Sequence, residues 1–366
     1  MCNFLYVLLH WAFGDYPFLL IRYNRFIMRK LVYAFVILLA VIFVIAQFTE
    51  VRSIMDTLQR GDWLFIFLAI GMQLLWIVNV ALSYQVLFRA TGIREKLSKL
   101  VLLSAAANFL NVVAPSVGMS GMAVFIAEAK RQGYSSGRVT VGGVSYWLFD
   151  YAGFLFVLAL GLVVLFQDGI LNGAEIVATL LLLLQATFLA SMLYLGMRSS
   201  QALGDFLAGC ARAVNRLLHP VLRRQVLLEE RAYSFAHEAS AGLHQLRHNM
   251  RNLGFPLLLG LSNKLILLAI FSFMFQAFQV PATWSKLVAG FSVMYLFFIM
   301  SITPSGIGVV EGVLTLVLTS MRVSMSDAVV VTLAYRGITL WLPLLYGFLA
   351  FRYLSRRPES LEAVQA

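Results

Sequence analysis

The stretch SITPSGIGVVEG, residues 301–312, interrupts an otherwise apolar segment with a proline and three glycines. A similar stretch, NVVAPSVGMSG at residues 111–121, interrupts a second apolar segment. A proline removes a backbone donor and obstructs the preceding helical turn, so each stretch predicts a broken helix. In both cases a serine, Ser135 or Ser324, follows 20 residues after the proline and precedes another long apolar segment. The repetition predicts a duplicated core with paired broken helices, which a membrane tolerates only where irregular backbone is buried or lines a polar cavity.

The composition around these breaks is that of a membrane protein. Of 366 residues, 61% are hydrophobic and 12% are charged, whereas about a quarter of the residues in a soluble domain are charged. Several apolar runs have the roughly 20 residues that a helix needs to cross a bilayer. We therefore predict an all-α integral membrane protein with about eight transmembrane helices and two re-entrant helical hairpins. The expected spans are 31–48, 63–88, 100–113, 139–166, 176–196, 253–280, 287–302 and 328–353.

Two similar units are expected within one transmembrane domain. The expected segments are an N-terminal extension or interfacial segment at 1–27, the transmembrane domain at 28–357 with repeat one at 63–166, an amphipathic insert at 198–252 and repeat two at 253–353, and a C-terminal tail at 358–366. Each repeat contains a short apolar helix, 118–130 or 308–321. At 1.5 Å per residue such a helix reaches only about 20 Å. It therefore predicts a hairpin that re-enters the membrane; the alternative is a tilted full span.

The positively charged residues are distributed unequally between the two sides of the predicted membrane. A cytoplasmic N-terminus puts 22 of the 28 Lys and Arg residues in cytoplasmic segments, as the positive-inside rule requires. We therefore expect a multi-pass protein of the cell inner or plasma membrane with both termini in the cytoplasm. The two hairpins then enter from opposite sides, so the repeats are inverted. Basic residues beside a bilayer attract anionic lipids, so the net charge of +11 does not indicate nucleic-acid binding.

The insert carries eight arginines against four acidic residues, with apolar residues between them at helical spacing. This pattern predicts interfacial helices on the inner leaflet, with Pro220 as a bend. His244 and His248 are four residues apart, but no carboxylate or cysteine completes a ligand set. We expect a solvated helix face and no metal site.

Charges inside apolar spans need a partner, water or a function, because each costs at least about 2.5 kcal/mol at a helix centre. Asp150 and Arg336 lie 35 and 32 residues after the proline of their own repeat, on helices that inverted symmetry would place against one another. We predict that they pair. The pair would be either a salt bridge that fixes helix register or a grip on a lipid headgroup.

Further polar residues surround the breaks. Lys264 is in the middle of a span and is expected to face the cavity. Glu311 is expected to close a backbone amide at a helix start, or to couple transport to a proton or cation. Asn108 and Asn111 share a helix face; together with the serines and glycines of the breaks they could bind a headgroup or serve helix packing. The candidate lipid-binding residues are Asn108, Asn111, Pro115, Ser116, Asp150, Lys264, Pro304, Ser305, Gly306, Gly308, Glu311, Tyr335 and Arg336.

Motifs of the common soluble catalytic sites are missing. The sequence contains no GxSxG, no Walker loop and no HExxH, so we expect neither enzymatic activity nor a cofactor.

Two stretches of repeat two, TPSGIGVVEG (303–312) and YRGITLWLPLLYG (335–347), resemble the transmembrane flippase-like region of lysylphosphatidylglycerol synthases. NFLNVVAPSVGMSGMAVFIAEAKRQGYSSGR (108–138), followed by SYWLFDYAGF (145–154), is similar to a glycine-rich variant of the same family. The resemblance implies that Asp150, Glu311, Tyr335 and Arg336, with the proline and glycines of the second break, are functional. Many relatives have an arginine and a Gly-Glu pair in the first hairpin, which this chain lacks.

The resemblance implies movement of lipids, or of lipid-linked polar groups, between leaflets. The expected function is therefore flippase-like translocation or binding of an anionic, aminoacylated or glycan-linked lipid. Two alternatives are a non-transporting partner that presents lipid to a membrane glycosyltransferase, and a carrier of small ions or solutes. The expected partners are membrane lipids, with a membrane enzyme under the first alternative. The sequence does not indicate an oligomeric state.

Overall fold

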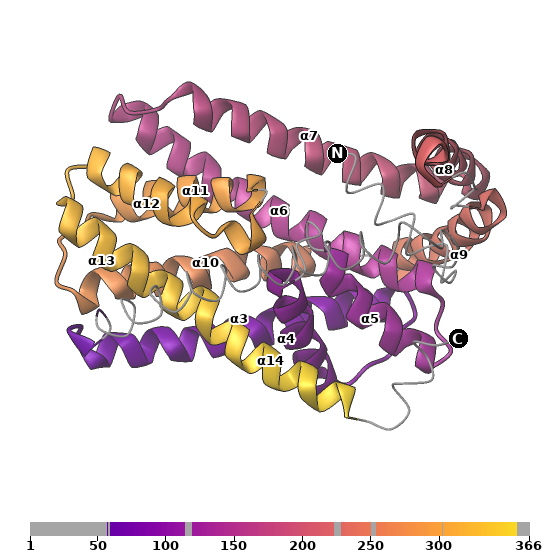
Figure 1. The fold of residues 1–366 in the computed structure, drawn as a ribbon, viewed down its shortest axis with the longest axis horizontal. Helices are drawn as coiled ribbons and strands as arrows, with labels where there is room; N and C mark the ends of the chain where they lie inside the picture. Colours follow the sequence, from indigo (N-terminus) through magenta and orange to yellow (C-terminus); the bar gives the residue numbers. More distant parts are fainter. Residues whose placement is uncertain are drawn as a thin grey trace, which may run out of the picture.

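The computed structural model describes residues 57, 59–113, 119–222, 228–249, 254–301 and 303–356. Within these ranges all regular structure is helical (Figure 1), which confirms the predicted all-α class. The helices are α3 (Trp63–Ala90), α4 (Leu97–Val113), α5 (Met119–Arg131), α6 (Ser136–Gln167), α7 (Gly173–Arg198), α8 (Ser200–Leu222), α9 (Glu229–Asn249), α10 (Gly254–Ala277), α11 (Trp284–Met300), α12 (Val309–Ser320), α13 (Met325–Arg336) and α14 (Leu342–Ser355), with a 3₁₀ turn at Pro304–Gly306 and a π turn at Gly337–Trp341. The predicted segments 1–27, 31–48 and 358–366 lie outside the described residues.

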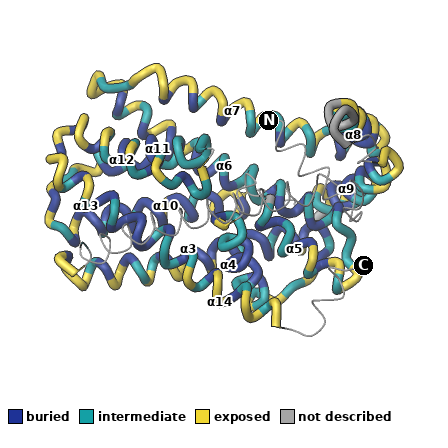
Figure 2. Tube along the Cα trace, viewed as in Figure 1, coloured by how far each residue is buried: buried dark blue, intermediate teal, exposed yellow. Residues whose placement is uncertain are grey.

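Long apolar helices dominate the bundle. Among the described residues, α3, α6, α7, α10 and the continuous stretch Met325–Ser355 are long and apolar enough to cross a membrane. Large apolar side chains lie on the surface, and Figure 2 shows α7 exposed along its length. Leu180 and Leu184, both 60% exposed, are examples. A soluble protein rarely exposes such extended apolar patches, so this surface faces lipid. The chain is a multi-pass membrane protein.

Two pairs of shorter helices complete the bundle. Helices α4 and α11 have 17 residues each and pack against α5 and α12, respectively. In Figure 1 the α4–α5 pair lies in one half of the molecule and the α11–α12 pair in the other, along the direction in which α3, α7 and α10 run. The predicted spans 100–113 and 287–302 are therefore each the first arm of a hairpin. Re-entry of these hairpins into a bilayer stays a prediction.

The helices of the two predicted repeats interlock. Helix α3 packs against α10, α4 against α14, and α11 against α6. The last two contacts are close at a glycine in each case. A methyl group on Gly161 of α6 would overlap Ser292 of α11, and one on Gly347 of α14 would overlap the Ala105 carbonyl of α4. Small residues allow membrane helices to approach in this way.

Hydrogen bonds at helix starts explain the two serines that recur after the prolines. The Ser135 hydroxyl accepts from the Arg138 amide at the start of α6, and Ser324 accepts from the Asp327 amide at the start of α13. A serine in this position satisfies an amide that has no partner within the helix. The recurring spacing therefore marks the start of the helix that follows each hairpin, α6 or α13.

Helix α13 does not continue as a regular helix into α14. A π turn at Gly337–Trp341 follows Arg336 directly, and Pro343 lies in the first turn of α14. Proline cannot donate to the turn before it, and π turns inside helices occur often at functional sites. The span predicted as one helix at 328–353 is thus continuous, but it contains a π turn beside its charged residue.

The amphipathic insert forms α8 and α9. Figure 1 views α8 nearly end-on while α7 and α10 run across the view, so α8 lies across the direction of the spans. Glu238 of α9 accepts a hydrogen bond from the Gly137 amide at the start of α6, at 3.1 Å. The Ser240 hydroxyl donates to the Gly196 carbonyl at the end of α7, at 2.8 Å. Helix α9 is therefore fixed to the ends of two spans. Pro220 lies in the last turn of α8.

Candidate functional site

A cavity of about 300 Å³ lies where the two hairpins meet α3 and α6. Its wall includes Asn108 and Asn111 of α4, Asp150 of α6, Tyr295 of α11, and Ser301, Ser305 and Gly306 from the second break. A second cavity of about 90 Å³ shares part of this wall, including Trp76, Asn108 and Ser305, and adds Gln73, Tyr335 and Arg336. The structure thus brings together seven predicted site residues. The predicted residues Pro115 and Ser116 lie outside the described part of the chain.

Asp150 is bonded to side chains that lie outside the cavity wall. The ammonium of Lys264 lies 2.7 Å from Asp150 Oδ2 and donates to the Tyr295 hydroxyl at 2.6 Å. Asn263 Nδ2 donates to Asp150 Oδ1 at 2.8 Å. Lys264 is completely buried and lines neither cavity. The prediction that Lys264 faces the cavity is therefore wrong: it supplies the counter-ion for a carboxylate that does.

Arg336 is bonded to the second break instead of to Asp150. Its Nε donates to Glu311 Oε1 at 2.5 Å, and its Nη2 donates to the Ser305 carbonyl at 3.0 Å. The predicted ion pair of Asp150 with Arg336 is therefore wrong. The physical reason is that each charge already has a nearer partner, Lys264 on α10 for Asp150 and Glu311 on α12 for Arg336.

Glu311 has the helix-start role predicted for it. Its Oε2 accepts from the Gly308 amide at 2.6 Å, at the start of α12. The break before it is tightly wound: φ is 49° at Ser305, 71° at Gly306 and 82° at Gly308. Pro304 opens this turn. Because a non-glycine residue rarely adopts positive φ, Ser305 requires support, and the bond from Arg336 to its carbonyl provides it.

Asn111 joins the two arms of the first hairpin. Its Oδ1 accepts from the Gly121 amide at 2.7 Å and from the Ser120 hydroxyl at 3.1 Å. The packing interpretation of this residue is therefore supported, although the side chain also lines the larger cavity.

Three buried polar atoms at the cavity walls have no hydrogen-bond partner among the described residues. They are Gln73 Oε1, Trp76 Nε1 and Ser104 Oγ. A buried polar group without a partner is costly, so such atoms are normally satisfied by water or a ligand. None of these three residues is among the site residues predicted from the sequence. Gln73 could have been found, because it is a polar residue in the middle of the apolar α3.

Comparison with known proteins identifies the family of the chain. The family model for the lysylphosphatidylglycerol synthase TM region matches residues 31–347. The chain belongs to this family. The match contains both hairpins and every residue named at the two cavities. No curated protein shows a significant match to the chain.

The base of the first hairpin carries a charge cluster. Glu128 of α5 lies 2.5 Å from Lys99 of α4 and 3.2 Å from Arg131. Burial alone would raise the pKa of Glu128, but the hydrogen bond and charge of Lys99 and the charge of Arg131 outweigh it and lower the pKa. The cluster joins the two arms at the end opposite to the tip.

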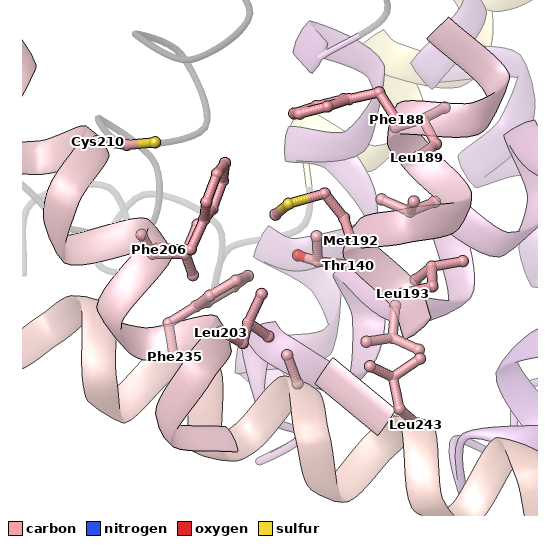
Figure 3. Close-up of a pocket in the computed structure, with 14 residues that line it drawn as sticks. Thr140, Phe188, Leu189, Met192, Leu193, Leu203, Phe206, Cys210, Phe235 and Leu243 are labelled. Atoms are coloured by element: carbon pink, nitrogen blue, oxygen red, sulfur yellow. The ribbon is translucent and has the colours of Figure 1, made fainter. Parts of the chain in front are cut away.

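A third pocket in this family member is apolar. It lies between α6, α7, α8 and α9 and is lined by side chains such as Phe188, Leu193, Phe206 and Phe235 (Figure 3). Its volume is about 80 Å³. None of the predicted site residues contributes to it, and a hydrocarbon wall offers no partner to a polar headgroup. The polar cavities between the hairpins are therefore the candidate site.

Proposed function

We propose that this chain is a flippase-like membrane protein that binds a lipid headgroup between its two hairpins and moves it between leaflets. The observation that carries the proposal is a cavity of about 300 Å³ with several polar side chains in its wall, inside a bundle that exposes large apolar side chains. Its wall contains a carboxylate, two asparagines and buried polar atoms without partners. In a membrane, polar groups and irregular backbone at such a depth are typical of a substrate pathway.

The arrangement of helices supports a pathway from both sides. Hairpins α4–α5 and α11–α12 lie in opposite halves of the bundle (Figure 1), as two inverted repeats with re-entrant hairpins require. Asp150 and Arg336 each precede their close-packing glycine, Gly161 or Gly347, by 11 residues. Counted from the prolines, the two positions differ by three residues, about one helical turn, so similar positions in the two repeats carry opposite charges. We place both termini in the cytoplasm and the protein in the inner or plasma membrane, on the distribution of Lys and Arg.

The proposed mechanism requires only the headgroup to leave the lipid phase. The headgroup enters between the hairpins and contacts the asparagines and the backbone of the second break, while the acyl chains remain in lipid. The substrate class is an anionic, aminoacylated or glycan-linked lipid. Transport is downhill or coupled to an ion, since the sequence has no nucleotide-binding motif. In this proposal the chain is not an enzyme.

Reconstitution tests this function. Proteoliposomes with fluorescent phosphatidylglycerol report leaflet exchange, because dithionite quenches only the outer leaflet. We expect exchange above that of empty liposomes and a loss of at least ten-fold in Asp150→Asn, which removes the charge at the cavity wall. Leu184→Ala, on the lipid-facing surface, is the matched control and should exchange normally. Equal rates in the two variants would contradict the proposal.

The same preparation separates the alternatives. A lipid-presenting partner would show no exchange and would co-purify with a membrane glycosyltransferase. A solute carrier would move a soluble ion into the vesicles without lipid exchange.

A further inference from the structure

We infer that the smaller cavity, of about 90 Å³, is a subsite for a phosphate group, and that the phosphate takes the place of Glu311 as the counter-ion of Arg336. The inference rests on the proposed function in taking a phospholipid headgroup as the natural ligand. It adds the chemical group that is recognised, the residues that recognise it, and an internal competitor.

The cation at this subsite, Arg336, is held in place and has N–H donors that its described contacts do not use. Arg336 is 4% exposed, and its described contacts involve Nε and Nη2 only. A guanidinium has five N–H donors in a planar fork, so Nη1 is available to a ligand in the cavity that Arg336 lines. This fork matches two oxygens of a phosphate better than a lysine would.

Glu311 is the partner that can withdraw. The side chain of Arg336 is 5% exposed, whereas that of Glu311 is 18% exposed. Glu311 also accepts from the Gly308 amide, so it keeps one hydrogen bond when it leaves the arginine. Its helix begins directly after the strained turn at Ser305. An anion entering from the cavity therefore competes with a carboxylate that shares its hydrogen bonds between Arg336 and the Gly308 amide.

Two buried polar atoms in the same wall have no hydrogen-bond partner in the part of the chain that the structure describes. They are Oε1 of Gln73, a residue that is 1% exposed, and the donor Nε1 of Trp76. The Gln73 amide donates weakly to the Tyr346 hydroxyl, at 3.4 Å. With the amide turned over, Tyr346 would donate to Oε1 and Nε2 would donate into the cavity. Gln73 and Trp76 together then offer two donors to the same phosphate.

The first helices of the two repeats place different groups beside the buried charges. Gln73 lies in the interior of α3, and Lys264 lies in the interior of α10. In one case the first helix supplies a cation to the acid Asp150. In the other case α3 supplies the neutral amide of Gln73, which lines the same cavity as the cation Arg336. The acid, Glu311, comes from the second hairpin. The subsite therefore contains a cation whose only described anionic partner is Glu311.

Binding of sn-glycerol 3-phosphate to the full chain in detergent tests the inference, with isothermal titration calorimetry as the readout. This soluble probe has no acyl chains, so binding does not depend on leaflet exchange. We expect Glu311→Gln to bind at least ten-fold more tightly than the unmodified protein, because the competitor loses its charge. Arg336→Gln and Arg336→Lys should bind at least ten-fold more weakly, and so should Gln73→Glu. Glu128→Gln, a matched loss of a paired carboxylate outside the cavities, should leave the affinity unchanged.

The outcomes distinguish this inference from the proposed function. Unchanged or weaker binding of the probe to a folded Glu311→Gln protein would overturn the role of Glu311 as a competitor. A lack of saturable binding to both the unmodified protein and Glu311→Gln would overturn it as well. Arg336→Gln also removes support from Ser305 and could fold poorly. In that case the decisive comparison is between Gln73→Glu and Gln73→Asn. We expect Gln73→Asn to bind the probe within three-fold of the unmodified protein and Gln73→Glu to bind it at least ten-fold more weakly. Binding with this pattern but without leaflet exchange retains the subsite and rejects translocation. Exchange without the pattern rejects the subsite alone.

Discussion

Lys264 shows how a single residue shapes the larger cavity. Its side chain is wholly buried, and its ammonium contacts Asp150 Oδ2 and the Tyr295 hydroxyl. A buried cation is tolerated only with a good partner, and so is a buried carboxylate. The pair therefore allows a carboxylate to stand at the wall of a cavity that is surrounded by apolar helices.

Replacing Lys264 by methionine would leave Asp150 without its counter-ion. We expect Lys264→Met to lower the free energy of unfolding by about 3–5 kcal/mol, the usual cost of breaking a buried pair. The double variant Lys264→Met with Asp150→Asn should recover most of this loss, because no charge is then left unpaired. Reversible unfolding in mixed micelles measures each variant. Simple addition of the two single effects would show that the residues are not coupled.

The sequence was sufficient to single out the buried charges but not to pair them. Asp150 and Arg336 stand out because each interrupts an apolar segment at a similar distance from a proline. Distance along the chain indicates how deep a residue lies along its helix. It does not indicate which neighbouring helix faces that residue, and the partners Lys264 and Glu311 come from two such neighbours. Gln73 was not predicted, although its place in the middle of the apolar α3 distinguishes it.

Ser305 offers a second test at the residue scale. Its φ of 49° is a conformation that glycine adopts freely and that costs other residues of order 1–3 kcal/mol. We expect Ser305→Gly to raise the free energy of unfolding by up to about 1 kcal/mol, and Ser305→Val to lower it. Thermal unfolding of the two variants measures the difference. A more stable valine variant would contradict the conformation of the break.

At the scale of the element, the two hairpins are closed in different ways. Asn111 bonds to the second arm of the first hairpin, near its tip. In the second hairpin the tip is held by Arg336, which comes from outside the hairpin. The helix starts were predictable, since Ser135 and Ser324 recur at equal distances from the prolines. The π turn after Arg336 was not, because a glycine and a proline six residues apart fit both a kinked and a continuous helix.

The charge cluster at the base of the first hairpin predicts a pH dependence. The pKa of Glu128 is lowered below its ordinary value, because the hydrogen bond and charge of Lys99 and the charge of Arg131 outweigh the effect of burial. A lowered pKa means that the stabilising contribution is present above the unfolded-state pKa and is lost as the pH falls through the folded-state pKa. As the pH falls below the unfolded-state pKa of a glutamate, about 4.3, we expect the midpoint temperature of unfolding to decrease. We expect Glu128→Gln to reduce this dependence. An identical acid profile in the variant would argue against the cluster.

At the scale of the whole molecule, the two cavities depend on the hairpins lying in opposite halves of the bundle. The larger cavity is lined both by α4 and by the second break, so neither repeat forms it alone. If the repeats are inverted, the turn between α5 and α6 and the turn between α12 and α13 lie on opposite sides of the membrane. These turns contain the exposed residues Gln132 and Arg322.

Single cysteines at these two positions test the inverted arrangement directly. In a background with Cys2 and Cys210 replaced by serine, a membrane-impermeant maleimide applied to intact cells should label Arg322→Cys. It should label Gln132→Cys only after the membrane is permeabilised, because the basic residues around the first hairpin place that turn in the cytoplasm. A cysteine at Leu184, which faces lipid, is the control that should resist labelling in both conditions. Labelling of both turns from the same side would make the repeats parallel, and the hairpins could then no longer form a pathway open to each leaflet in turn.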